Sequence, residues 1–329
     1  MSVEIIVLIV ILGLIFDYTN GFHDAANVVS TVIATGALRP FVAILMAGIF
    51  NALGATQISG VAQTISTGLV EASLASQSMI LAALAGAIFW NLATWYFGVP
   101  SSSSYALIGG LMGAALVAGG SSIIIWKGLV FKVVIPMLVS PVIGFCLAFA
   151  LMKLLFKLGH RKKESRLFSH LQIISAAAVA LAHGLNDAQK SMGIITLGLF
   201  AAGLIGAPVI PFWVIMSCAL VMGLGTASGG FRIIRTVGFE ITKLHPIHGF
   251  AAEMSSSFVI LAASFLGMPI SSSHLITGSV TGVGTARGAG AVHWATAHKV
   301  IVAWFLTLPG AALVAALVSL FLNFFDITI

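Results

Sequence analysis

The sequence has few charged residues: only 7% of its 329 residues are Asp, Glu, Lys or Arg, whereas 59% are hydrophobic. A soluble domain carries about 25% charged residues, so this chain cannot cover itself with a water-facing surface. It has only two cysteines, Cys146 and Cys218, which lie in separate apolar stretches. Two distant cysteines provide neither a disulfide framework nor metal-ligand spacing, and we expect both to be packing residues.

What the chain has instead is apolar sequence almost from end to end, with a mean hydropathy of +1.12. The apolar stretches occupy residues 3–36, 41–65, 76–97, 101–118, 123–152, 171–199, 208–228, 248–268, 271–286 and 298–325. The first stretch begins without basic residues, so we expect a retained helix rather than a cleaved leader. Because crossing a bilayer takes about 20 apolar residues, the sequence predicts an all-α polytopic membrane protein with about 10–12 transmembrane elements.

One basic segment, residues 153–170, interrupts this pattern and divides the chain into two halves, residues 1–152 and residues 171–329. Basic loops stay on the cytoplasmic side of a membrane, so we expect this loop inside and do not expect a nucleic-acid partner. Each half contains an odd number of apolar stretches, which places the second half upside down relative to the first. The sequence therefore predicts two inverted-topology repeats with both chain termini outside.

Two motifs each occur twice, in the same order. "GFHDAAN" (21–27) corresponds to "GLNDAQK" (184–190), and "GVPSSSSYALIGG" (98–110) corresponds to "GMPISSSHLITGS" (267–279). The apolar stretches that follow the serines are short for a full span. Short paired segments in equivalent places of two halves are typical of a transporter's binding site.

Charged residues within the apolar stretches need partners, because an acid at the centre of a bilayer costs about 2.5–3.5 kcal/mol on insertion scales. Asp24, Asp187 and Glu253 lie in such stretches. One interpretation is a structural ion pair between the halves, such as Asp24 with Lys190. We favour a coupling-ion site, in which the neighbouring glycines and amides permit a broken helix with free carbonyl groups.

The serine clusters suit the complementary role of binding an anion. They follow Pro100 and Pro269 and comprise Ser102, Ser103, Ser104, Ser271, Ser272 and Ser273. Proline followed by serine is typical of a helix start, where unpaired N–H groups and hydroxyls bind anions. Alternatively, the hydroxyls bond back to carbonyls of their own helices. Because the pattern recurs, we expect the acids and serine-rich tips of both halves to surround one pocket near the midplane.

At these residues the sequence resembles the inorganic phosphate transporter (Pit) family, which carries a duplicated "GANDVANA-like" signature and a duplicated "P-x-S-[ST]-[ST]-H" element. The matches are "NGFHDAANVVSTVIATGAL", "AHGLNDAQKSMGIITLGL", "GVPSSSSYALIGG" and "GMPISSSHLITGS", spread over nearly the whole chain. The resemblance implies phosphate symport by alternating access, with no cofactor and no resident metal. It assigns Asp24, Asp187 and Glu253 to the coupling ion. The implied phosphate-binding residues are the six serines with Asn27, Asn186 and Lys190.

Three positions depart from the general signature. His23 and Lys190 stand where it has Asn, and Asn51 stands where the sodium-coupled members carry Glu. All three resemble the bacterial low-affinity, proton-coupled branch, so we expect a proton as the coupled ion, with sodium as the alternative. His23 and His183 adjoin the signatures and are candidate proton relays. The branch implies the bacterial inner membrane and a substrate that is free phosphate or a metal–phosphate complex, and it leaves a homodimer open.

Two other functions fit parts of the pattern. A permease for sulfate or another tetrahedral oxyanion would share the fold, although only protonated phosphate donates a hydrogen bond to a carboxylate such as Asp24. An intramembrane hydrolase would use a Ser/His or Asp/Asp pair, but the chain contains neither "HExxH" nor "GxSxG". Duplicated acids and serines suit alternating access better than hydrolysis, so we predict a transporter and not an enzyme.

Overall fold

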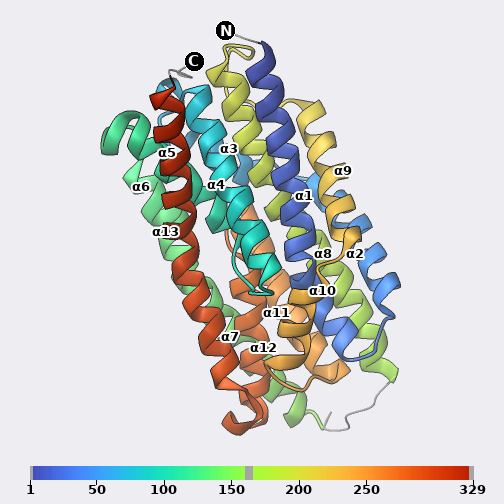
Figure 1. Ribbon diagram of the computed structural model, residues 1–329. Helices are drawn as coiled ribbons and strands as arrows, with labels where there is room; N and C mark the ends of the chain where they lie inside the picture. The colour runs from blue at the N-terminus through green and yellow to red at the C-terminus, as the bar shows by residue number, and fades with distance from the viewer. Residues whose placement is uncertain (1–2, 160–165, 326–329) are drawn as a thin grey trace.

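The computed structural model describes residues 3–159 and 166–325, which form helices joined by short turns (Figure 1). The first half contains α1 (Val3–Ala34), α2 (Pro40–Ala55), α3 (Gly60–Thr67), α4 (Gln77–Tyr96), α5 (Ser103–Gly119), α6 (Trp126–Gly128), the π-helix η3 (Leu129–Val134) and α7 (Ile135–Lys157). The second half contains α8 (Arg166–Ala201), α9 (Phe212–Ser228), α10 (Phe231–Arg235), the π-helix η4 (Thr236–Glu240), α11 (Pro246–Phe265), α12 (Ser272–Arg287) and α13 (Trp294–Phe324). Each predicted apolar stretch coincides with one helix or a run of successive helices, which confirms the all-α fold.

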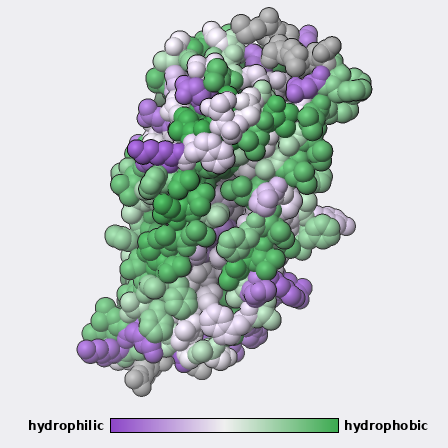
Figure 2. All heavy atoms as spheres, turned by 90° about the vertical axis from the view of Figure 1, so that its left-hand side faces the viewer, coloured by the Kyte–Doolittle hydropathy of each residue, from purple (hydrophilic) through white to green (hydrophobic). Residues whose placement is uncertain are grey.

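Several of these helices suit a membrane. Within the described residues, six are long and apolar enough to cross one, or up to eight if each of two bent helix pairs counts as one span. Large apolar side chains cover the outer helices; Val142 on α7 is 59% exposed and Leu313 on α13 is 62% exposed. Figure 2 shows one face of this surface, a broad hydrophobic band with hydrophilic residues mainly toward its two ends. Such a surface is stable against lipid rather than water.

The two halves repeat the same order of elements in opposite directions. The hairpin of α4 and α5 lies in the same part of the molecule as both chain ends, whereas the hairpin of α11 and α12 lies in the opposite part (Figure 1). Isolated antiparallel bridges recur in matching places, Val70 with Ile124 and Thr242 with Val292. The halves also exchange partners, because α7 packs on α12 and α13 packs on α5. Each hairpin is therefore enclosed by a long helix of the other half.

The predicted breaks at the signature aspartates are wrong, because α1 and α8 run through Asp24 and Asp187 as continuous helices. The neighbouring glycines serve helix packing instead. A Cβ atom on Gly184 would lie 2.0 Å from the Asn51 carbonyl oxygen on α2, and one on Gly21 would lie 2.8 Å from the Met222 carbonyl oxygen on α9. The breaks fall elsewhere: α2 and α3 are bent by 68°, and α9 bends by 60° into α10 and η4.

The central basic segment is also shorter as a loop than the sequence predicts. Helix α7 continues to Lys157 and α8 already begins at Arg166. Lysine and arginine are good helix formers, so the charged ends of the segment extend the two helices beyond their apolar parts. Residues 160–165 lie outside the described residues.

We expect Gly184→Val to destabilise the protein, because the new side chain meets the α2 backbone, which cannot rotate away. Overpacking of this kind costs about 1–3 kcal/mol or more. Thermal unfolding in detergent measures the loss as a lower midpoint temperature. Gly290→Val is the matched control, since a Cβ there has nothing within 4 Å; equal midpoints for the two variants would contradict this packing role.

Candidate functional site

The two signature aspartates lie together in the interior. Asp24 on α1 is 1% exposed and Asp187 on α8 is fully buried. One ligand atom each from Asp24, His183 and Asp187 can be chosen such that all three lie within 4.8 Å of one another. The tips of both hairpins reach the same place. The acids and serines of the two halves thus form one buried polar group, which we call the central cluster: Asp24, Asn27, Ser103, Ser104, Asp187, Lys190, Ser272 and Ser273.

Asp24 accepts hydrogen bonds from both hairpin tips. Ser103, at the start of α5, donates to its Oδ2, and Ser273 on α12 donates to its Oδ1 at 3.0 Å. The Asn27 amide donates to Asp24 Oδ1 at 2.9 Å and to Ser273 Oγ at 2.8 Å. This first-half acid is therefore held by a hydroxyl from each half of the chain.

Asp187 is held by the second tip and by a buried ammonium group. Ser272 donates to its Oδ2 at 3.0 Å, and Lys190 forms an ion pair with its Oδ1. Lys190 also donates to Ser104 Oγ and, at 2.9 Å, to the Ile270 carbonyl oxygen, so it joins both tips. Lys190 thus pairs with the acid one turn away on its own helix. The alternative interpretation, a structural ion pair of Lys190 with Asp24 between the halves, is wrong.

Each acid also has a histidine beside it. His23 Nδ1 lies 3.1 Å from Asp24 Oδ1, and His183 Nε2 lies 2.8 Å from Asp187 Oδ2. The other ring nitrogen of His183 lies 3.2 Å from the Asn51 side-chain oxygen. The i,i+4 spacing of His183 and Asp187 on one helix is a signal in the sequence, because such residues share a helix face.

Three other predicted residues position the cluster rather than join it. Ser102 and Ser271 are the N-caps of α5 and α12, and each accepts a hydrogen bond of 3.2 Å from the backbone N–H three residues later. Asn186 donates to Ser264 Oγ at 2.8 Å and to the Met268 carbonyl oxygen at 3.2 Å, where it supports the turn between α11 and α12. The capping bonds set the direction in which the next serines face.

Glu253 lies in a separate polar group. It is fully buried on α11 and accepts hydrogen bonds from Thr31 on α1 and from Gln172 and Ser175 on α8. Thr35, which is partly exposed, donates to the Gln172 side-chain oxygen at 2.7 Å. Among the described residues, Glu253 has no ion-pair partner. Uncharged donors thus surround this acid and extend toward the surface.

Sequence reasoning missed one further buried acid, Asp17 on α1. It is fully buried, Ser191 on α8 donates to its Oδ1 at 2.6 Å, and its Oδ2 has no hydrogen-bond partner in the part of the chain that the structure describes. The signal was present in the sequence, because an acid inside an apolar stretch is costly and marks a functional position.

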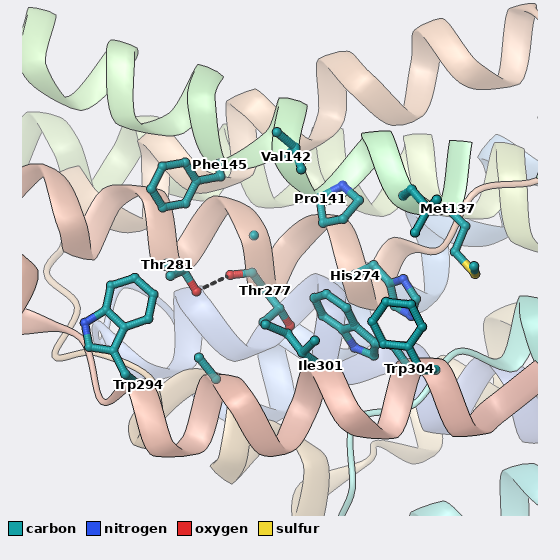
Figure 3. Close-up of a pocket in the computed structure, with 14 residues that line it drawn as sticks. Met137, Pro141, Val142, Phe145, His274, Thr277, Thr281, Trp294, Ile301 and Trp304 are labelled. Atoms are coloured by element: carbon teal, nitrogen blue, oxygen red, sulfur yellow. Dashed lines mark hydrogen bonds between the residues drawn. The ribbon is translucent and has the colours of Figure 1, made fainter. Parts of the chain in front are cut away.

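His274, which follows the second serine cluster, faces a different environment. It lines an apolar groove of about 350 Å³ between α7, α12 and α13, and its ring stacks on Trp304 at a centroid distance of 4.0 Å (Figure 3). Farther along the groove, Thr281 Oγ1 donates to the Thr277 carbonyl oxygen at 2.7 Å. Tyr105 occupies the corresponding position of the first half, and its ring centroid lies 5.1 Å from that of His274. The histidine therefore packs behind the serines rather than within the central cluster.

The central cluster is closed and short of positive charge. Its side chains are at most 4% exposed, so neither end of the molecule gives access to it in this conformation. With neutral histidines, two carboxylates and one ammonium group leave one net negative charge. An oxyanion that enters would add more negative charge in a medium where uncompensated charge is expensive. A proton or another cation that enters with the anion would offset this charge.

Comparison with known proteins places the chain in a family. Residues 20–315 match the model of the phosphate transporter family. The chain belongs to this family. The sequence is 44% identical to a probable low-affinity inorganic phosphate transporter of Rhizobium meliloti (strain 1021), over 96% of each chain. It is 44% identical to a protein of the same description from Bacillus subtilis (strain 168), over 96% of this chain and 97% of that one.

A solved structure supports the fold of this phosphate transporter family member. The structure described as "The sodium-dependent phosphate transporter" superposes with a TM-score of 0.89 at 28% sequence identity, covering 98% of this chain and 99% of that one. The resemblance read from the duplicated motifs is confirmed. The relatives are named as transporters, which agrees with the expectation that the protein is not an enzyme.

We expect substitutions of the two kinds of serine at each tip, those that reach Asp24 and those that cap a helix, to have different effects. Ser103→Ala and Ser273→Ala each remove a hydroxyl that reaches Asp24, and the loss of a hydrogen bond to a charged group is worth about 1.5–3 kcal/mol. Phosphate uptake by proteoliposomes should fall, or its KM rise, by about 10-fold or more.

The control variants are Ser102→Ala and Ser271→Ala, which remove helix caps. They should lower the free energy of unfolding by about 0.5–2 kcal/mol and leave the KM for phosphate close to that of the wild type. Equal loss of uptake in all four variants at equal stability would contradict the division of roles.

Proposed function

We propose that this protein imports inorganic phosphate together with a proton, by alternating access of the central cluster to the two sides of the membrane. The observation that carries the proposal is the sharing of Asp24 between the two tips, Ser103 from the first half and Ser273 from the second. The hydroxyls and helix N-termini of both tips suit a tetrahedral oxyanion. Protonated phosphate, unlike sulfate, can also donate a hydrogen bond to the carboxylates, which favours phosphate over sulfate.

The closed central cluster supports alternating access. Each hairpin approaches it from a different end of the molecule and is enclosed by a long helix of the other half. Movement of one half, residues 1–152, against the other, residues 171–329, would open the cluster to one side at a time. This movement requires both halves to contribute side chains to the same ligand. The hydrogen bonds of Ser103 and Ser273 to Asp24 show that side chains of both halves reach one place.

Two features favour a proton over sodium. Lys190 places an ammonium group against Asp187, where a metal cation would be repelled. Asn51, whose amide donates to Thr226 at 2.8 Å, is a neutral residue beside His183. Sodium remains the alternative, because the structural relative is described as sodium-dependent.

Glu253 is the residue that we assign to the coupled proton. Ser175 Oγ lies in hydrogen-bond reach of both Glu253 Oε2 and the Gln172 carbonyl oxygen, at 3.0 Å from the latter. When Glu253 is charged, Ser175 donates to it; when Glu253 is protonated, it donates to Ser175, which then donates to the carbonyl. Both protonation states are therefore fully hydrogen-bonded, so the site can load and release a proton without leaving a polar atom unpaired.

We place the protein in the bacterial inner membrane. The end of the molecule with Lys157 and Arg166 would face the cytoplasm, and the described ends of α1 and α13 would lie outside. The positive-inside rule supports this orientation. In it, the cytoplasmic side holds the connections before α2 and α11, with Arg39 and Lys243, and the end of α12 at Arg287. The substrate would be free phosphate or a metal–phosphate complex. A homodimer remains part of the proposal.

Uptake of labelled phosphate into proteoliposomes, with pH and sodium varied independently, tests the function. We expect an inward proton gradient to drive accumulation without sodium, arsenate to compete and sulfate not to compete. Asp24→Asn and Asp187→Asn should abolish uptake, because each changes a carboxylate of the central cluster. Accumulation that requires sodium at fixed pH with no pH gradient would reject proton coupling.

We expect Glu253→Gln to uncouple the two fluxes. The amide keeps the size of the side chain but cannot carry a proton, so accumulation driven by a pH gradient should be lost. Exchange of external labelled phosphate for internal phosphate should persist, since Glu253 lies outside the central cluster. Retained gradient-driven accumulation in this variant would exclude Glu253 as the proton carrier.

A further inference from the structure

A cavity of about 570 Å³ lies beside the tip of the first hairpin. Its walls are the turn after α4, the successive helices α10 and η4, and the first turns of α13; Figure 1 shows α10 next to this tip. Three cations, Arg232, Arg235 and Lys299, line it with one acid, Glu240. Arg235 Nε lies 3.6 Å from Glu240 Oε1, and both side chains are largely exposed, so this pair is weak. The cavity is therefore basic.

One of these cations is held in place before any ligand arrives. Arg232 donates to the Tyr96 carbonyl oxygen, and its guanidinium lies 5.3 Å from the Trp95 ring and 5.1 Å from the Tyr96 ring. Thr236 donates to the Gly98 carbonyl oxygen at 3.3 Å, which ties the same element to the turn. A stacked guanidinium still has free N–H donors and loses little freedom when it binds an oxyanion.

Buried residues next to the cavity connect it by hydrogen bonds to the central cluster. Pro100 lines the cavity, and the next residue, Ser101, is fully buried. Ser101 Oγ donates to Thr94 Oγ1 at 2.8 Å and lies 3.3 Å from His23 Nε2. The other nitrogen of the His23 ring lies 3.1 Å from Asp24. Ser101 and His23 thus separate the basic cavity from the acid that both hairpin tips share.

The corresponding turn of the second half lacks this chemistry. Gly98 and Gly267 have the same backbone conformation, with φ of 66° and 63°, so the turns match. A cavity of about 280 Å³ adjoins the second turn, but its lining residues are apolar except for Ser140. Lys132 is near and donates to the Leu266 carbonyl oxygen at 2.7 Å, without lining that cavity. The repeated fold does not by itself require cations at this place.

We propose that the basic cavity binds a phosphate-type oxyanion between the central cluster and the aqueous phase, at the end of the molecule that carries residues 157 and 166. The proposal rests on the proposed function, since it gives the transported anion a second binding site on its pathway through the protein. Cations that line a cleft raise the local concentration of an anion and its rate of association. The oxyanion is free phosphate or the headgroup of an anionic lipid, which the test distinguishes.

The test variant is Arg235→Gln/Lys299→Gln, which removes two cations that have no buried partner. Its matched control is Arg39→Gln/Lys243→Gln, which removes two exposed cations outside the cavity. Phosphate exchange is measured in phosphatidylcholine proteoliposomes over a range of ionic strength. We expect the KM of the test variant to rise about three- to tenfold and to depend less on salt, at an unchanged maximal rate. The control should behave as the wild type.

Addition of phosphatidylglycerol identifies the source of the oxyanion. A headgroup site predicts that this lipid stimulates the wild type and not the test variant, with equal KM values in phosphatidylcholine. The proposal is overturned if the test variant matches the wild type in KM, salt dependence and lipid response, or if the control shows the same changes. The proposed function is tested separately: phosphate exchange by the wild type and its loss in Asp24→Asn would support transport. That result would stand even if the cavity proposal failed.

Discussion

Buried charge is the constraint on which the rest of this structure depends. Among the described residues, four carboxyl side chains lie in the interior, Asp17, Asp24, Asp187 and Glu253, and Lys190 is the one buried Lys or Arg. A charge out of water costs several kcal/mol unless hydrogen bonds or an opposite charge replace its hydration. The donors have to come from polar side chains brought to mid-depth, which is why two hairpins end inside the molecule with serines at their tips. Close packing at the signature glycines holds α1 against α9 and α8 against α2.

The duplicated scaffold carries different chemistry in its two halves. The position of Asn27 in the first signature is occupied by Lys190 in the second, and both side chains donate to serines of the hairpin tips. The amide gives Asp24 a neutral hydrogen-bond donor, whereas the ammonium forms an ion pair with Asp187. Glu253 likewise corresponds to an apolar position of the first half. The repeated backbone therefore places an ammonium group beside Asp187 and an amide at the corresponding position beside Asp24.

The sequence predicted those parts of the fold and of the candidate site for which a local pattern is compatible with a single structure. The odd number of apolar stretches in each half predicted the inversion. The duplicated motifs predicted the meeting of acids with serines, because repetition restricts the possible arrangements. Gly184 was ambiguous, since a glycine in a helix suits a break or a close contact, and only the distant α2 backbone decides between them. A helix start cannot be placed to one residue from sequence. The helix cap Ser102 therefore could not be distinguished from Ser103, whose hydroxyl reaches Asp24. Asp17 was missed although its cost in an apolar stretch was visible.

The hydrogen bonds of the closed cluster give a physical reason for the proposed binding of anion and cation together. A serine hydroxyl has one proton to donate. Ser273 directs its proton toward Asp24, and Ser103 lies in hydrogen-bond reach of both Asp24 and the Asn20 side-chain oxygen, at 2.5 Å from the latter. In the proposed mechanism phosphate would use the same donors, so phosphate and a charged Asp24 without a bound cation would compete for them. A proton or another cation at Asp24 weakens its demand for hydroxyl donors and removes its repulsion of the anion at once. Under the proposed mechanism the proton that Glu253 carries would have to reach Asp24, and Glu253 itself would need no contact with the phosphate.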